Sequence, residues 1–474
     1  MAEAARGKKF IKDLGIYAIG NLGAKFISFL LVPLYTHYIT SPTEYGIYEL
    51  IVTISFCLIP LLCCQMTDGG FRFLIETKNI DRHRAVISYI SKLLISNSVL
   101  LIGVAAICGL FYPSKYLPYI VVYGIFQTVY EVCVQLLRGL GYTKAFVLAG
   151  IINATITAIL GVTFLAGFGM GIEGILISVI SAKIVTVSLL NWKLHIWRDY
   201  ISFKFIDKSI SKELLCYSLP LIPVAIGWWF VSANNRFFIE RYLGLTDTGY
   251  YGLVCSFTGI LYVLCFIFYQ TWQQNAIEQY NSPDRNAFFS SVFNSYFFLL
   301  CALVSIFPYA LRFNYGWLVG ANYQESSQYL FLNSLYVMAF SLAAFFEIAY
   351  QCAKRTARIL PSLILAIAIS VLCNFLLIEW LQVNGVILSS VFTYVSLLIY
   401  RIFDTRKFMQ ITFAWKNIFP ILILVACFVL YYQPLPRMAD LIICMSAALL
   451  FVFFAPKGLK ESIAKKLFAK VHKG

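Results

Sequence analysis

Residues 31–54 read LVPLYTHYITSPTEYGIYELIVTI, and residues 237–260 read FFIERYLGLTDTGYYGLVCSFTGI. Each stretch leaves one apolar run, crosses a short polar turn and enters a second apolar run. Tyr45-Gly46-Ile47 in the first stretch matches Tyr251-Gly252-Leu253 in the second. The two stretches therefore indicate that one pair of helices occurs twice in the chain.

A second match supports this internal repeat. Two apolar runs carry the same polar residues at spacings i, i+4 and i+7, namely Glu131, Gln135 and Arg138 in one run and Glu347, Gln351 and Lys354 in the other. The two matches occur in the same order, at offsets of 206 and 216 residues. Each repeat holds six predicted helices. Because six is even, both repeats enter the membrane the same way round, as parallel repeats do.

The composition places these helices in a membrane. Of 474 residues, 60% are hydrophobic and 12% are charged, and the mean hydropathy is +0.79. The chain cannot consist of several soluble domains, because so few charged residues could not cover the surface of such domains. A membrane-spanning helix needs about 20 apolar residues, so we predict an all-α polytopic membrane protein with about 14 spans. The predicted spans are residues 14–39, 45–66, 86–111, 117–138, 145–167, 172–192, 214–242, 249–275, 288–312, 327–351, 359–380, 384–403, 416–433 and 439–455.

The repeat and the spans together predict four parts. The N-terminal lobe (helices 1–6) covers residues 1–205, and the C-terminal lobe (helices 7–12) covers residues 206–410. Helices 13 and 14 follow in residues 411–456, and residues 457–474 form an amphipathic basic tail on the membrane surface. Two six-helix lobes that face each other across a cleft are typical of a transporter that works by alternating access.

The basic residues predict the orientation. Of 37 lysines and arginines, 29 lie in the N-terminal tail, alternate loops and the C-terminal tail, whereas the opposite loops hold only Lys115, Arg241, Arg312 and Arg437. Because cytoplasmic loops are rich in lysine and arginine, both termini are predicted to be cytoplasmic. The net charge of +15 thus reflects topology, and we expect no nucleic-acid partner.

The sequence offers little for an enzyme. The predicted outer loops are short, the longest running from about Phe313 to Ser326, whereas membrane glycosyltransferases and ligases usually carry a large outer loop or domain. No phosphate-binding glycine loop, nucleophile elbow or HExxH pair occurs. The 13 cysteines include no CxxC pair, and no His-Cys cluster has metal spacing. We therefore expect no catalytic residues, no metal and no cofactor.

Residues 20–35, GNLGAKFISFLLVPLY, and the turn YITSPTEYGIYEL at residues 38–50 resemble the start of bacterial polysaccharide flippases of the Wzx type. These belong to the multidrug/oligosaccharidyl-lipid/polysaccharide exporter superfamily, and the likeness covers roughly residues 10–405. It implies a flippase in the bacterial cytoplasmic (inner) membrane that moves an undecaprenyl-diphosphate-linked oligosaccharide to the outer leaflet for surface polysaccharide biosynthesis. The expected partners are this lipid, membrane lipids, polysaccharide polymerase or assembly proteins, and a coupling proton or sodium ion.

Two cations inside predicted spans are candidate substrate-binding residues. Lys25 lies near the middle of helix 1 with Asn21 on the same face, and Arg236 lies near the outer end of helix 7 beside Asn235. Insertion of a charged side chain at the centre of a membrane helix costs about 2.5–3.5 kcal/mol. The resemblance implies that cations in the cavity bind the diphosphate of the substrate, as in related flippases. Many family members carry an acidic residue where Asn235 stands, which leaves the coupling mode open. Alternatively, Lys25 pairs internally or snorkels, and Arg236 pairs with Glu240 at i+4.

Three polar sets are candidates for gating or ion coupling. They are Glu131 with Gln135, Glu347 with Gln351, and Asp68 with Arg72. The glutamates could bind protons in a desolvated site, or they could make structural contacts between helices. The aspartate–arginine pair, at spacing i, i+4 at the inner end of helix 2, suits a gate or a helix cap.

Three alternatives to this function remain open. A lipid II (peptidoglycan precursor) flippase of the same superfamily would also have fourteen helices. A drug/cation antiporter normally needs acidic residues deep in its first and seventh helices, where helix 1 here carries Lys25. A membrane glycosyltransferase is disfavoured by the short outer loops.

Overall fold

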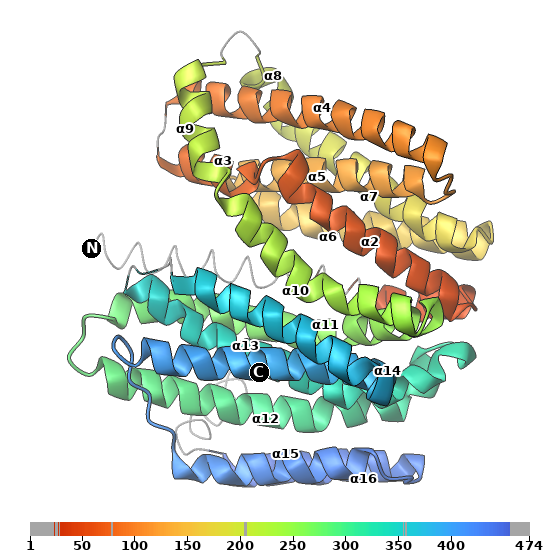
Figure 1. Cartoon of the computed structure of the whole chain (residues 1–474), viewed down its shortest axis with the longest axis vertical. Coiled ribbons are helices and arrows are strands. Elements are labelled where there is room, and N and C mark those ends of the chain that lie inside the picture. Colours follow the sequence, from red (N-terminus) through yellow and green to blue (C-terminus); the bar gives the residue numbers. More distant parts are fainter. Residues whose placement is uncertain are drawn as a thin grey trace, which may run out of the picture. The chain divides into compact units, whose positions relative to one another are not determined.

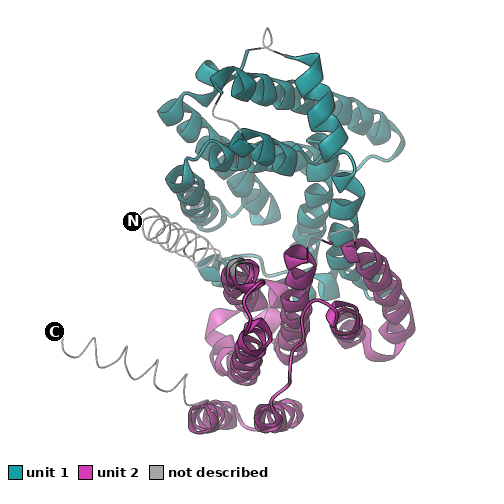
Figure 2. Ribbon diagram, turned by 90° about the vertical axis from the view of Figure 1, so that its left-hand side faces the viewer, with its two compact units in different colours: residues 1–252 teal, residues 253–474 magenta. Residues whose placement is uncertain are grey.

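The computed structural model describes residues 23, 27, 29–76, 79–202, 206–353, 355 and 358–455. Every regular element in these ranges is a helix, which confirms the predicted all-α class. Contacts divide the chain into two compact units, Met1–Gly252 and Leu253–Gly474 (Figure 2). This division falls later in the chain than the predicted lobe boundary at 205/206, and that boundary stays a prediction.

Unit 1 contains the helices up to the first two turns of α11 (Figure 1). A helical segment at 29–38 precedes α2 (Pro42–Leu62), α3 (Met66–Glu76), α4 (Ile80–Phe111), α5 (Leu117–Gly139), α6 (Thr143–Val162) with a π-helical turn (Thr163–Gly167), α7 (Gly171–Leu194), α8 (Ile196–Tyr200), α9 (Lys208–Ser218) and α10 (Leu221–Tyr242).

Unit 2 contains most of α11 and all later helices. They are α11 (Leu245–Gln279), α12 (Arg285–Leu318), a 3₁₀ helix (Ala321–Tyr329), α13 (Leu330–Cys352), α14 (Ile359–Thr405), a 3₁₀ turn (Trp415–Asn417), α15 (Ile418–Tyr431) and α16 (Arg437–Phe454). In Figure 1, α15 and α16 lie side by side along α12, and both helices contact it.

Within the described residues, eleven helical stretches are long and apolar enough to cross a membrane, and Trp415–Tyr431 is a shorter apolar one. The chain is therefore a multi-pass membrane protein. These stretches lie at the predicted spans from 45–66 onward. Half of the first predicted span, 14–39, lies outside the described residues.

The longest helix, α14, is a hairpin of two helices. Gln382 interrupts it with a non-helical backbone (φ 51°, ψ −132°), at the boundary predicted between spans 359–380 and 384–403. The two ends of α14 meet, because Arg358 Nη1 donates to Asp404 Oδ1 over 2.7 Å. A straight helix of this length would keep its ends about 70 Å apart. The hairpin confirms that two spans occur here.

The predicted span 45–66 corresponds to α2 and the turn that follows it, and a separate helix, α3, begins at its last residue, Met66. The chain turns at Cys64 and Gln65, which have φ values of 48° and 54°, and α3 follows at an angle. Pro60 lies inside α2 shortly before the turn, where it removes a backbone hydrogen bond. The short helix α3 is not among the candidate spans.

Candidate functional site

The repeated stretches meet each other in unit 1. A Cβ atom on Gly46 of α2 would overlap the carbonyl oxygen of Leu245, and a Cβ atom on Gly249 would overlap that of Pro42. Only glycine lets two helix backbones approach this closely. Positive-inside topology predicts that this crossing lies near the outer face of the membrane.

The crossing has approximate two-fold symmetry. Thr43 Oγ1 lies 2.8 Å from Thr246 Oγ1, and these residues are 203 positions apart. The same offset relates Pro42 to Leu245 and Gly46 to Gly249, which make the two reciprocal contacts. The structural register is therefore 203, three residues less than the Tyr-Gly match predicted. It aligns TEYGIYEL (43–50) with TDTGYYGL (246–253).

Arg236 lies beside this crossing and is paired. Its guanidinium contacts the Glu49 carboxylate of α2 through Nε at 3.1 Å and Nη2 at 3.0 Å, and it lies over the ring of Tyr251. Both charged side chains are mostly buried. Arg236 thus forms its ion pair with Glu49 and not with Glu240, and no regular spacing in a sequence connects residues so far apart.

Asn235 belongs to the same cluster. Its side-chain amide donates to Tyr251 Oη over 3.0 Å, and Trp229 one and a half turns earlier on α10 donates to the Thr53 carbonyl of α2 over 2.9 Å. Asn235 is buried. The predicted neighbours Lys25 and Asn21 lie outside the described residues, so the expected two-cation cluster stays a prediction.

Glu131 lies on α5 in a largely buried polar cluster. It accepts a hydrogen bond of 2.9 Å from Gln127 and interacts electrostatically with Lys183 of α7. The Lys183 ammonium is buried and lies 5.0 Å from the Tyr123 ring centroid. Gln135 follows one turn later on α5 and is half-buried.

Glu347 occupies the matching position in unit 2. Its carboxylate lies 2.8 Å from Arg401 Nη2, and the Arg401 side chain is 1% exposed. Arg401 also donates to the Ala343 carbonyl over 2.8 Å. Gln351 accepts a hydrogen bond of 2.6 Å from Gln273 and donates to Tyr269 Oη over 3.3 Å.

Each unit thus places a glutamate of one helix against a cation two spans later. Sequence reasoning identified both glutamates but not their pairing with Lys183 and Arg401, because partners on different helices have no fixed spacing in the sequence. A comparison of the two repeats could have found them, since each cation occupies the sixth span of its repeat. Whether either glutamate couples to an ion stays a prediction.

Asp68 and Arg72 do not form the expected pair. Arg72 pairs with Glu76 over 2.9 Å and lies 4.6 Å from the Tyr217 ring centroid. Asp68 accepts a hydrogen bond of 2.8 Å from Gln65 at the α2–α3 turn. The hydrogen bond to Tyr217, followed by that to Glu76, raises the pKa of Arg72, so this arginine stays charged. The two residues stabilise separate local structures.

The segment between α14 and α15 is fastened along α12, and we call residues 409–414 the strap. Thr412 N donates to Ser290 Oγ over 3.0 Å, Asn294 Nδ2 donates to the Thr412 carbonyl over 2.9 Å, and Ala414 N donates to Asn294 Oδ1 over 2.9 Å. Ser290 and Asn294 are one turn apart on α12, so their side chains reach the backbone of Thr412 and Ala414 in succession.

Unit 1 contains the equivalent arrangement. Ser202 N donates to Ser88 Oγ of α4 over 2.8 Å, and the same hydroxyl donates to the Tyr200 carbonyl over 3.1 Å. The third span of the first repeat thus holds the segment that follows α7. The strap is held in the same way by the ninth span, which is the third span of the second repeat. No motif in the sequence predicts these contacts, because single serines are common in membrane helices.

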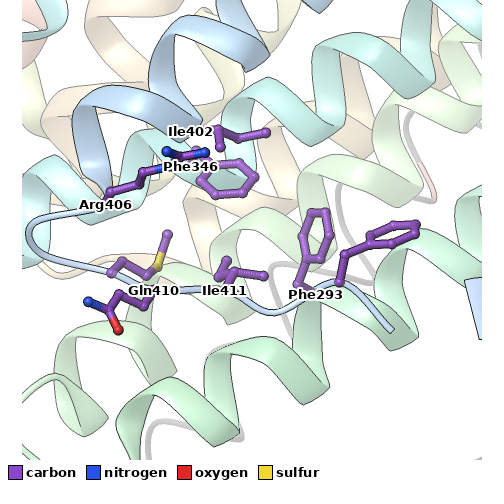
Figure 3. Close-up of a pocket in the computed structure, with 8 residues that line it drawn as sticks. Phe293, Phe346, Ile402, Arg406, Gln410 and Ile411 are labelled. Atoms are coloured by element: carbon purple, nitrogen blue, oxygen red, sulfur yellow. The ribbon is translucent and has the colours of Figure 1, made fainter. Parts of the chain in front are cut away.

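A cavity of about 410 Å³ opens beneath the strap (Figure 3). It is mainly apolar, with the Arg406 and Gln410 side chains as its polar groups. Its lining residues are Phe293, Phe346, Ile402, Arg406, Met409, Gln410, Ile411 and Phe413. Among the described residues, no group of three His, Cys, Asp or Glu side chains could hold a metal ion.

Comparison with protein families identifies the chain. The sequence profile described as "Polysaccharide biosynthesis protein" matches residues 10–272, more than half of the chain. The chain belongs to this family. The match confirms the resemblance predicted from the turn at residues 38–50. Among curated protein sequences, none matches the chain significantly.

Solved structures establish the fold of this polysaccharide biosynthesis family member. A lipid II flippase, MurJ, in an inward closed conformation shares 13% identity, with a TM-score of 0.73, and the match covers 94% of this chain and 99% of that one. A multidrug resistance MATE family transporter of the MOP superfamily, in an inward-facing conformation, shares 14% identity with a TM-score of 0.66, covering 82% and 97%. The chain therefore has the polytopic fold of these transporters.

Proposed function

We propose that the chain is a flippase that carries a polyprenyl-diphosphate-linked oligosaccharide from the inner to the outer leaflet of the bacterial cytoplasmic membrane. The observation that carries this proposal is the combination of a polysaccharide biosynthesis family match with a fold shared with a lipid flippase. For a membrane protein with this fold in polysaccharide biosynthesis, the expected substrate is the lipid-linked sugar, because the sugars are built on lipid carriers inside the cell.

The α2–α11 crossing gives this proposal a mechanism. Alternating access requires that the outer ends of the repeats separate and rejoin. In the described structure the helix ends that we place on the outer side meet at Gly46 and Gly249, and the Arg236–Glu49 ion pair joins α10 to α2 beside this contact. We assign this ion pair as a latch on the outer side. Opening would break the pair and release the Arg236 guanidinium, which could then bind a diphosphate through charge-assisted hydrogen bonds.

The energy source is part of the proposal. We expect the membrane potential or a proton or sodium gradient to drive the cycle, with Glu131 and Glu347 as the candidate coupling groups. Each glutamate has a cationic neighbour, Lys183 or Arg401, so a change in the charge of the carboxylate would alter an interaction between helices.

A reconstituted assay tests the function. Purified protein in proteoliposomes would receive lipid-linked oligosaccharide extracted from the cells that make this chain. The sugar that remains accessible from outside would then be measured with a membrane-impermeant periodate reaction. We expect transfer between leaflets above the rate in protein-free vesicles. Equal rates in both preparations, under an imposed potential and an imposed proton or sodium gradient, would overturn the proposal.

A lipid II flippase is the second candidate, because the MurJ match covers nearly all of both chains. The same vesicles loaded with lipid II decide between the two. Transfer of lipid II in preference to the extracted oligosaccharide lipid would favour the second candidate. The family match favours the first candidate.

A further inference from the structure

Unit 2 carries a continuous wall of aromatic rings on three neighbouring helices. On α11, the rings of Tyr262, Phe266 and Tyr269 are nearly parallel, with interplanar angles of 8° and 11° between successive rings. Phe340 of α13 lies 5.2 Å from Tyr262 and 5.2 Å from Tyr394 of α14, measured between ring centroids. We call these residues, together with Tyr336 against Tyr394, the aromatic wall.

The wall is accessible on its α11 side. Tyr262 is 41% exposed and Phe266 is 40% exposed. Accessible rings on a membrane helix can face either lipid or an aqueous space, and their neighbours on the helix distinguish the two. Gln270 and Gln273 adjoin the stripe of wall residues on α11, whereas the other side of the helix, at the depth of the rings, carries the exposed Leu264 between the half-buried Ile260 and Ile267. Polar side chains avoid lipid, so the wall faces the polar side.

Hydrogen-bonding groups surround the inner end of the wall. Tyr269 Oη accepts a hydrogen bond from Gln351, which in turn accepts one from Gln273. The Glu347 carboxylate, part of whose surface is accessible, lies close enough to interact electrostatically with Tyr269. An aromatic surface bordered by amides, phenols and a carboxylate is the usual construction of a site with both apolar and polar recognition.

This combination fits a sugar better than a lipid tail. A pyranose ring presents one or two apolar C–H faces, which pack on aromatic rings, and a rim of hydroxyl groups, which hydrogen-bond to amides and carboxylates. An acyl or polyprenyl chain needs no hydrogen-bonding rim. The predicted topology also places the wall in the middle and the cytoplasmic half of spans 249–275, 327–351 and 384–403, on the side where the sugar is assembled.

We infer that the aromatic wall is the subsite for the oligosaccharide of the transported lipid, with Tyr262 and Phe266 as its stacking platform and Gln273 and Gln351 as its polar rim. This inference rests on the proposed function. It adds that the protein recognises the sugar itself, in addition to the diphosphate and the lipid chain.

Binding measurements on the purified full-length chain test the inference. The probes are lipid-linked oligosaccharide extracted from the cells that make this chain and synthetic undecaprenyl diphosphate without sugar. We expect the wild type to prefer the first probe. Tyr262→Ala and Phe266→Ala should each reduce this preference about three- to tenfold, because each removes one stacked ring, while affinity for the bare lipid stays unchanged.

Matched variants separate sugar recognition from folding. Leu264→Ala changes a similarly exposed side chain (39%) on the other side of α11, and Phe375→Ala removes an aromatic ring that is 60% exposed on α14. Both should keep the wild-type preference. Tyr262→Phe conserves the ring and should retain most of the preference for the sugar-bearing lipid. This variant serves as the reference should Tyr262→Ala not fold.

The possible failures are distinguishable. If the wild type binds neither probe, the proposed function fails. If the wild type prefers the sugar-bearing lipid and the wall variants keep that preference, the inference alone is wrong. If the wall variants weaken both probes equally, the rings belong to an interfacial aromatic belt, and the inference is again wrong.

Discussion

At the scale of single residues, the Arg236–Glu49 ion pair is the first to test, because it joins α10 to α2 beside the α2–α11 crossing. If the pair acts as a latch, Arg236→Gln and Glu49→Gln should each impair transport. Exchange of the two residues (Arg236→Glu with Glu49→Arg) should restore part of the activity. Transport by proteoliposomes measures all three variants.

The alternative for Arg236 gives a different pattern. If its only role were to bind the diphosphate, Arg236→Gln would abolish transport, whereas Glu49→Gln would leave it intact or raise it. Such a result would contradict the latch. Glu240→Gln, which removes the acidic residue at i+4, is the control and should transport normally.

Arg401 should matter for stability. It is 1% exposed and has its carboxylate partner on another helix, while its Nε has no hydrogen-bond partner among the described residues. Removal of one partner from a buried pair costs about 3–5 kcal/mol in soluble proteins. Arg401→Ala should therefore lower the thermal unfolding temperature in detergent markedly.

Arg406, which is exposed one turn further along, provides the control. Arg406→Ala should change the unfolding temperature little. Equal effects of the two substitutions would show that Arg401 contributes only through its position near the membrane surface.

At the scale of elements, the crossing of α2 and α11 depends on small residues. Gly46→Ala would place a methyl group against the Leu245 carbonyl, so the helices must move apart. We expect this variant to lose transport while remaining folded. Gly103→Ala on α4, where no atom lies within 4 Å of the added Cβ, is the matched control. Normal transport by Gly46→Ala would show that the close approach is dispensable.

The strap gives a second prediction at this scale. Asn294 accepts from Ala414 N and donates to the Thr412 carbonyl, and each hydrogen bond contributes about 0.5–1.5 kcal/mol net. Asn294→Ala should expose residues 409–417 to limited proteolysis. Asn314 on the same helix bonds only within its own turn, to the Ala310 carbonyl, so Asn314→Ala should leave cleavage unchanged. Unchanged cleavage in both variants would mean that packing alone holds the strap.

Sequence reasoning succeeded for elements and failed for pairs of residues, for a physical reason. Hydropathy is a local property, so it located the helices, including both arms of the α14 hairpin. The partners Glu49 for Arg236, and Arg401 for Glu347, lie on other helices, and helix packing determines which side chains meet. The repeat register also differed by three residues, because glycine occurs at both Gly249 and Gly252, and the contacts of Gly46 and Gly249 in the structure distinguish the two registers.

At the scale of the whole molecule, the two-fold crossing predicts that transport can be locked. Thr43 Oγ1 and Thr246 Oγ1 are 2.8 Å apart. In a background in which the 13 native cysteines are replaced, Thr43→Cys with Thr246→Cys should form a disulfide under mild oxidation. We expect oxidation to stop transport and a reductant to restore it.

Single-cysteine variants complete that experiment. Neither Thr43→Cys nor Thr246→Cys alone should respond to oxidant. If the cross-linked double variant still transported substrate, the outer ends would not need to separate during the cycle, and the alternating-access mechanism proposed above would be wrong.

The two fastened segments have a consequence for how such a chain can grow. Ser88 holds the segment that leads from α7 to α9 and α10, and Ser290 holds the segment that leads from α14 to α15 and α16. In both segments a backbone N–H donates to a serine on the third span of the preceding repeat. A lobe of this design can therefore hold the start of the helices that follow it. Replacement of α15 and α16 would in addition require new partners for Arg312 of α12, which pairs with Asp440 of α16, and for Tyr309, which donates to the Cys427 carbonyl of α15.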